Sequence, residues 1–76
     1  MKYAHPVMSK KELLGMGFTR AYLDRAIAVP GQTFAWRLNP ANKSSPVLFD
    51  TEAFERWRLR EIAVAERARR QRQGVM

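Results

Sequence analysis

The sequence contains no cysteine and only one histidine, His5. Without cysteine the chain has no disulfide framework and no thiolate metal site. A lone histidine near the start of the chain supports neither a Ser-His-Asp nor a Cys-His catalytic arrangement, and no metal-ligand spacing is present. Glycine is also sparse, and the glycines at 15 and 17 are followed by no Walker lysine. We therefore expect a protein that is not an enzyme, with no catalytic residue, metal or cofactor.

Acidic residues and long apolar runs are scarce as well. Seven Asp and Glu residues stand against fourteen Lys and Arg residues, which gives a formal net charge of +7 and a sequence pI near 10.9. This balance is typical of domains that bind nucleic acids, so we expect a polyanionic partner. No stretch has the length of a membrane span, and the first residues lack the apolar run of a signal peptide. We expect a cytoplasmic protein with no membrane partner.

Residues 8–27 carry two helix-start signals separated by a glycine-containing turn. Ser9 and Glu12 have the spacing of a capping box, in which each side chain accepts a hydrogen bond from the backbone N–H of the other. Residues 15–17 then favour a tight turn, because glycine adopts positive φ without a Cβ clash. Thr19 is placed to cap a second helix. The sequence predicts helices over residues 10–14 and 20–28, the order of a helix-turn-helix.

The second predicted helix divides into an apolar face and a charged face. The apolar face holds Tyr22, Leu23, Ala26 and Ile27, and the opposite face holds Arg20, Ala21, Asp24, Arg25 and Ala28. A face with two arginines among small residues suits the DNA major groove, where arginine is the commonest partner of guanine. The alternative is a solvated charged face on a small helical domain.

Residues 33–49 have the pattern of a β-hairpin. Phe34, Trp36 and Leu38 alternate with other residues, which predicts a half-buried strand with these three side chains on one face. Residues 39–46 contain two prolines, two asparagines and two serines, which favours a loop. A short second strand follows over residues 47–49. Such a hairpin beside a helix-turn-helix is called a wing; the alternative is a two-stranded element that closes the core.

A third helix follows the hairpin. Asp50 is placed to cap it, and Phe54 and Trp57 share its apolar face. Strong helix formers continue to about Gln71, so we expect this helix to extend beyond the globular body. The predicted core consists of Leu13, Leu14, Phe18, Leu23, Ile27, Phe34, Trp36, Phe49, Phe54 and Trp57.

A row of arginines lies on the third helix opposite its apolar face. It consists of Arg56, Arg60, Arg67 and Arg70. Three interpretations stay open. The row follows DNA phosphates, binds a partner protein, or is solvated, with Glu55, Glu61 and Glu66 as partners on the same helix.

The order of these elements predicts a mainly α fold with a small β-hairpin: helix-turn-helix, two-stranded wing and C-terminal helix. This order resembles the winged helix-turn-helix of phage excisionases, of AlpA-like regulators and, more distantly, of the MerR-type DNA-binding domain. Thr19–Arg25 is similar to the family pattern Ser-Arg-x-Thr-Ile-Tyr-Arg. Phe49–Trp57 looks like the family's opening of the last helix, where Glu, an apolar residue and Trp pack that helix onto the recognition helix. The predicted organisation is a flexible N-terminal arm over 1–7, the winged domain over 8–60 and a basic helical extension over 61–76.

The resemblance implies that Thr19, Arg20 and Arg25 face DNA, together with Ala21 and Asp24 on the same face. It also implies that a wing loop made of Asn42, Lys43, Ser44 and Ser45 lies on the DNA backbone or in the minor groove. The expected function is sequence-specific binding of double-stranded DNA in a phage or mobile element, as an excisionase-like recombination directionality factor in the bacterial cytoplasm or nucleoid. Expected partners are DNA, a site-specific recombinase and further copies of the chain on DNA. Two alternatives are a small transcriptional regulator of the same fold and a protein-interaction module that uses the basic C-terminal helix.

Overall fold

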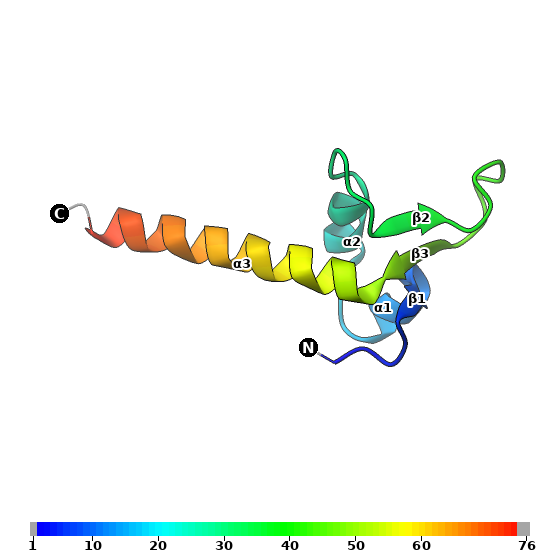
Figure 1. The fold of residues 1–76 in the computed structure, drawn as a ribbon, viewed down its shortest axis with the longest axis horizontal. Helices are drawn as coiled ribbons and strands as arrows, with labels where there is room; N and C mark the ends of the chain where they lie inside the picture. Colours follow the sequence, from blue (N-terminus) through cyan, green and yellow to red (C-terminus); the bar gives the residue numbers. More distant parts are fainter. Residues whose placement is uncertain (1, 75–76) are drawn as a thin grey trace.

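The computed structural model describes residues 2–74 of the chain, and side chains over residues 2–70. Within these residues it is a small mixed α/β domain with a long C-terminal helix (Figure 1). The elements in chain order are β1 (Val7–Ser9), α1 (Lys10–Gly15), α2 (Arg20–Ile27), β2 (Ala35–Arg37), β3 (Val47–Asp50) and α3 (Thr51–Gly74). The strands form one antiparallel sheet in the order β1-β3-β2. Residues 75–76, the end of the predicted extension, lie outside the described residues.

The predicted helix starts are confirmed. Ser9 Oγ accepts from the backbone N–H of Glu12 at 3.1 Å, and Glu12 Oε1 accepts from the N–H of Ser9 at 2.9 Å, so the capping box is complete. Thr19 caps α2 and Asp50 caps α3 through equivalent bonds of 3.1 and 3.2 Å. Gly17 has a φ of +111°, which explains why glycine suits the turn between α1 and α2. α3 continues to Gly74, beyond the predicted end near residue 71.

The expected two-stranded hairpin is wrong in one respect, because a third strand completes the sheet. β1 pairs with β3, with Met8 opposite Phe49, and Val7 belongs to it although the sequence assigns that residue to the arm. The hydroxyl of Thr51 also donates to the backbone carbonyls of His5 and Pro6. A strand of three residues is too short to show alternation, and its pairing joins positions about forty residues apart. The fold is therefore mixed α/β and not mainly α.

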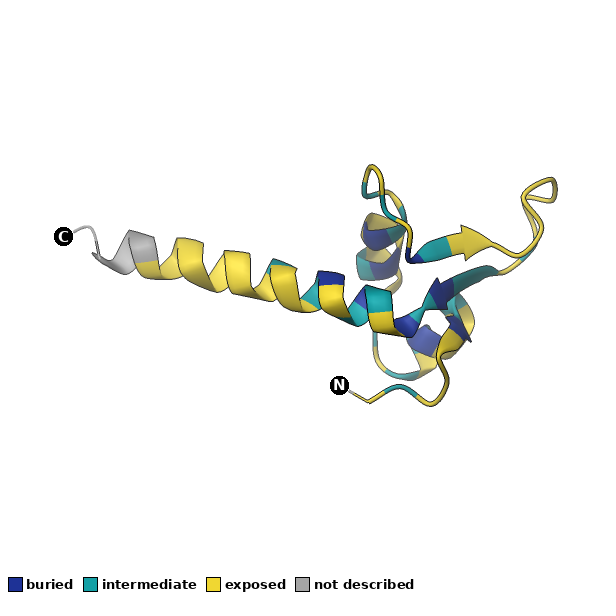
Figure 2. Ribbon diagram, in the orientation of Figure 1, coloured by how far each residue is buried: buried dark blue, intermediate teal, exposed yellow. Residues whose placement is uncertain are grey.

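The core is a cluster of apolar side chains beneath the sheet and between the helices (Figure 2). Its buried members are Met8, Leu13, Leu23, Ala26, Phe34, Phe49, Phe54 and Trp57, with Leu14, Phe18 and Ile27 partly buried against them. Nearly all of the predicted core is confirmed. The rings of Phe54 and Phe49 lie 5.2 Å apart at a steep angle, which is a favourable edge-to-face contact.

Trp36 is the predicted core residue that the structure contradicts, since its side chain is 42% exposed. The strand begins at Ala35, which lies opposite buried Phe49, so Ala35 occupies the core-facing side of β2. Trp36 then points to the other face, opposite Leu48. Phe34 reaches the core because it precedes the strand. One irregular residue at the strand start has therefore reversed the expected alternation.

Gln32 covers part of the outer edge of the sheet. Its amide oxygen accepts from the backbone N–H of Ala35 at 2.8 Å, and its amide nitrogen donates to the carbonyl of Ala35 at 3.1 Å. The same nitrogen donates to the carbonyl of Ile27, at the end of α2. One side chain thus satisfies both backbone groups of a strand residue and connects β2 to the end of α2.

The segment before β1 is attached to α3 by a part-buried polar group. Tyr3 donates its hydroxyl proton to Glu55 Oε1 at 2.7 Å, and Arg58 donates to both oxygens of Glu55 at 2.8 and 3.1 Å. The hydrogen bonds from Arg58 and Tyr3 outweigh the desolvation of the carboxylate and lower the pKa of Glu55 to about 2. Burial and the adjacent carboxylate raise the pKa of Tyr3 above its ordinary value.

α3 leaves the globular body after its third turn. Every residue from Ile62 to Arg70 is exposed, and Figure 2 shows this half of the helix standing away from the core. Its length alone would suit a membrane span. Within the described chain, however, no helix combines that length with enough apolar character to cross a membrane.

We expect Trp57→Ala to destabilise the domain by about 3 to 5 kcal/mol. Trp57 is 9% exposed and packs against the rings of Tyr22 and Phe34, at centroid distances of 5.9 and 5.3 Å. Trp36→Ala is the control, because this tryptophan is half exposed and should cost only about 1 to 2 kcal/mol. Thermal or urea denaturation gives both values. Equal losses for the two variants would contradict the assigned role of Trp57.

We expect the stabilisation supplied by Glu55 to depend on pH. Its pKa is lower in the folded state than the ordinary value of 4.5, so its contribution is present above pH 4.5 and is lost as the pH falls towards 2. The difference in unfolding free energy between the wild type and Glu55→Gln should therefore shrink over that range. Urea denaturation at a series of pH values measures it. Glu66→Gln, on the exposed half of α3, should show little such change, and a parallel trend in both variants would contradict the prediction.

Candidate nucleic-acid interface

The outward face of α2 consists of the residues that the sequence assigns to DNA contact. Thr19, Arg20, Ala21, Asp24 and Arg25 are all exposed, as is Ala28 at the end of the helix. Leu23 and Ala26 on the opposite face are fully buried. The predicted division of the helix into two faces is confirmed. The local cause is the spacing of its apolar residues, which fixes which side packs on the core.

Small residues form the centre of this face. At about 100° per residue, Ala21 and Ala28 lie along the middle of the outward surface, with Arg20 and Asp24 to one side and Arg25 to the other. Nothing longer than a methyl group therefore stands along the midline of α2. Its backbone can approach a flat or grooved partner closely while the longer side chains contact that partner from both sides.

Two ion pairs connect this face to the neighbouring helices. On one side, Lys10 of α1 bonds the carboxylate of Asp24. On the other side, Arg25 Nη2 donates to Glu61 Oε1 of α3 at 2.8 Å. One of the three open interpretations of the arginine row has Glu61 as a partner on its own helix, whereas in the structure its carboxylate contacts Arg25 of α2. Among the described residues, Arg20 has no carboxylate partner.

The β2–β3 loop presents the second group of expected contact residues. Asn42, Lys43 and Ser44 are exposed and Ser45 is half-buried. The hydroxyl of Ser45 accepts from the N–H of Asn39 at 3.1 Å and donates to its carbonyl at 2.9 Å. Asn42 Oδ1 accepts from the N–H of Ser44 at 2.9 Å. Asn42 and Ser45 therefore hold the loop in shape, and Lys43 is the exposed charged residue within it.

Arg37 is a basic residue of this hairpin that the sequence analysis did not select. It lies at the end of β2, is exposed, and its guanidinium donates to the backbone carbonyl of Lys43. This contact brings a second positive charge to the base of the loop. Its place two residues before the polar loop of residues 39–46 was the available signal, since a residue so close to a loop lies near the loop base. Figure 1 shows the β2–β3 loop and the loop after α2 on the same side of the molecule.

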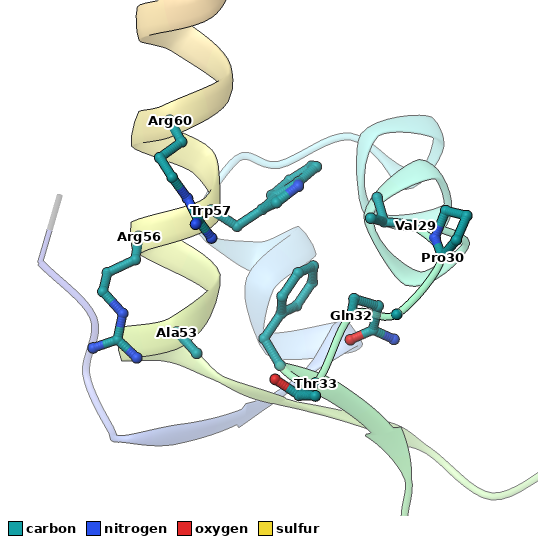
Figure 3. Close-up of a pocket in the computed structure, with 10 residues that line it drawn as sticks. Val29, Pro30, Gln32, Thr33, Ala53, Arg56, Trp57 and Arg60 are labelled. Atoms are coloured by element: carbon teal, nitrogen blue, oxygen red, sulfur yellow. The ribbon is translucent and has the colours of Figure 1, made fainter.

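An open hollow lies between the loop after α2 and the first half of α3 (Figure 3). Val29, Gln32 and Thr33 line it from the loop, and Arg56 and Arg60 from α3. Arg56 is paired with Glu52 at 3.0 Å, whereas Arg60 has no carboxylate partner among the described residues. The arginines that line the hollow add positive charge near the C-terminal end of α2.

The remaining arginines of the predicted row, Arg67 and Arg70, are exposed on the outer half of α3. They lie beyond the part of the helix that packs on the body, so the structure does not bring them to α2.

No group of three or more His, Asp or Glu side chains that could hold a metal ion occurs within residues 2–70. The described surface therefore presents cationic and hydrogen-bonding groups around a helix whose outward face carries small side chains.

Comparison of the chain with protein-family models, with curated proteins and with solved structures gives no match.

Proposed function

We propose that the chain is a sequence-specific binder of double-stranded DNA with a winged helix-turn-helix fold. α1 and α2 form the helix-turn-helix, α2 is the recognition helix, and the β2–β3 hairpin is the wing. The observation that carries the proposal is the outward face of α2: a midline of alanines flanked by Arg20 and Arg25, on a chain of net charge +7.

The dimensions of DNA favour this surface. The major groove is about 12 Å wide and admits one α-helix, provided that the helix surface facing the bases is not crowded. Ala21 and Ala28 meet that requirement, and an alanine methyl also contacts the methyl group of thymine well. The two flanking arginines reach guanine edges or phosphates, and the carboxylate of Asp24 accepts from the amino group of cytosine.

The wing supplies contacts that carry little sequence information. Lys43 and Arg37 put two positive charges on one hairpin, and a lysine ammonium binds phosphate as a point charge. Arg60, beside the hollow at the end of α2, is a third candidate for the backbone. These contacts fix the register of the protein on the duplex, so that α2 reads the bases.

The resemblance to excisionases suggests the biological role, a recombination directionality factor of a phage or mobile element that acts in the bacterial cytoplasm or nucleoid. In that role, several copies bind side by side and bend the attachment site for a site-specific recombinase. Bending has an elastic cost that the protein contacts must offset, which favours copies that load together. A small transcriptional regulator needs the same surface and only occupancy of an operator.

A second candidate function, a protein-interaction module, is favoured by the outer half of α3. Residues 62–70 are exposed and contain three arginines and one glutamate. An isolated helix of this length is marginal in water, so a bound acidic surface would stabilise it. In this alternative the helix-turn-helix serves only as a scaffold.

We expect the chain to bind duplex DNA in a salt-dependent way. Contact with roughly three to six phosphates predicts that log K falls with log salt at a slope of about −3 to −5. A fluorescence titration at several salt concentrations, with a selected site and a scrambled duplex, measures both the slope and the specificity. No binding of either duplex at low salt would overturn the proposal and favour the interaction module.

Substitutions should separate base reading from phosphate contact. Arg20→Ala and Arg25→Ala test the recognition helix, and we expect at least one to lose about 1 to 3 kcal/mol on the preferred site and to flatten the preference at one base pair. Lys43→Ala should weaken all sequences alike and make the salt slope shallower by about one unit. Binding to a randomised-site library reports all three. Unchanged preferences in both arginine variants would mean that α2 is not the recognition helix.

A further inference from the structure

The two arginines of the recognition helix differ in how they are held. Arg20 has no carboxylate partner among the described residues, so its side chain keeps its rotational freedom. Arg25 donates through Nη2 to Glu61 Oε1 at 2.8 Å, across two helices and 36 positions of the chain. A tertiary contact therefore restricts one arginine of the outward face and leaves the other unrestrained.

Glu61 lies where α3 still packs on the core, which fixes the position of its carboxylate. It lies on the part of α3 that Trp57 anchors in the core, one turn beyond that residue. Trp57 also packs against Tyr22 of α2, with ring centroids 5.9 Å apart, so the two helices are fixed relative to each other where the ion pair forms. The carboxylate is therefore presented to Arg25 by a rigid part of the domain.

From this geometry we propose that Glu61 is a positioning residue that orients Arg25 for base recognition and thereby sets the preference at one base pair. This inference rests on the proposed function of α2. An arginine has five N–H donors, and the contact with Glu61 uses one of its terminal nitrogens, which leaves donors for a guanine edge. Fixing the guanidinium beforehand reduces the conformational entropy lost when it binds the base.

The charge of Glu61 acts in the same direction. A carboxylate beside Arg25 reduces the attraction of that guanidinium for phosphates, which occur at every position of the duplex. A base contact of defined geometry is less affected by this loss. Glu61 is therefore expected to lower affinity for DNA in general and to raise discrimination among sites, since specificity is a difference between two affinities.

The test compares Glu61→Ala with Glu66→Ala. Both variants remove one negative charge from α3 and introduce a good helix former, but Glu66 is exposed on the outer half of the helix and forms no ion pair with α2 among the described residues. Glu61→Ala should strengthen binding to scrambled duplex more than Glu66→Ala does, because only Glu61 lies beside Arg25. Only Glu61→Ala should lose about tenfold in preference at one base pair, measured on a randomised-site library. Glu61→Gln, which keeps an acceptor oxygen at the same reach, should regain part of that preference.

A double-mutant comparison completes the test. In an Arg25→Ala background, Glu61→Ala should cause no further change in base preference, because the side chain that it positions is gone. The pair lies at the surface, with the Arg25 side chain 62% and the Glu61 side chain 36% exposed, so the unfolding midpoint should move little. If Glu61→Ala keeps the wild-type preference and matches Glu66→Ala in affinity, the positioning role is overturned while DNA binding stands. If the wild-type chain binds no duplex, the proposed function itself has failed.

Discussion

The rest of the structure depends on the contacts that the buried ring of Phe54 makes. Its ring lies in the first turns of α3 and within 6.4 Å of six other rings, which come from the N-terminal segment, the α1–α2 turn, α2, the loop before β2, β3 and α3 itself. Each segment is too short to be stable alone, since the strands have three or four residues and α1 has six. A single aromatic centre makes their folding cooperative and fixes the angle at which α3 meets α2.

The local features of this fold could be predicted from the sequence because their causes are local. The capping box of Ser9 and Glu12 and the caps at Thr19 and Asp50 depend on residues three positions apart, which the sequence displays directly. β1 could not be predicted, because three residues show no period and their partner, β3, follows about forty residues later. The orientation of Trp36 was missed for a related reason, since alternation does not reveal where a strand begins.

In the candidate site, too, the sequence predicts the features with local causes and misses the contacts between elements. The outward face of α2 follows from helical periodicity, so its exposed residues were identified correctly from the sequence. The partners of those residues, Lys10 for Asp24 and Glu61 for Arg25, depend on how three helices pack, which periodicity does not contain. The contacts of Ser45 that close the β2–β3 loop and the approach of Arg37 to Lys43 likewise depend on how the hairpin folds.

The Gln32 side chain protects part of the β2 edge from pairing with a strand of another molecule. A sheet that ends in an unpaired strand offers its backbone groups to any similar strand nearby, and that route leads to aggregation or to exchanged strands. Here a strand approaching Ala35 would have to displace the Gln32 side chain from both the N–H and the carbonyl before it gained a hydrogen bond. Protein molecules packed closely together would thus find the Ala35 position of the β2 edge already occupied.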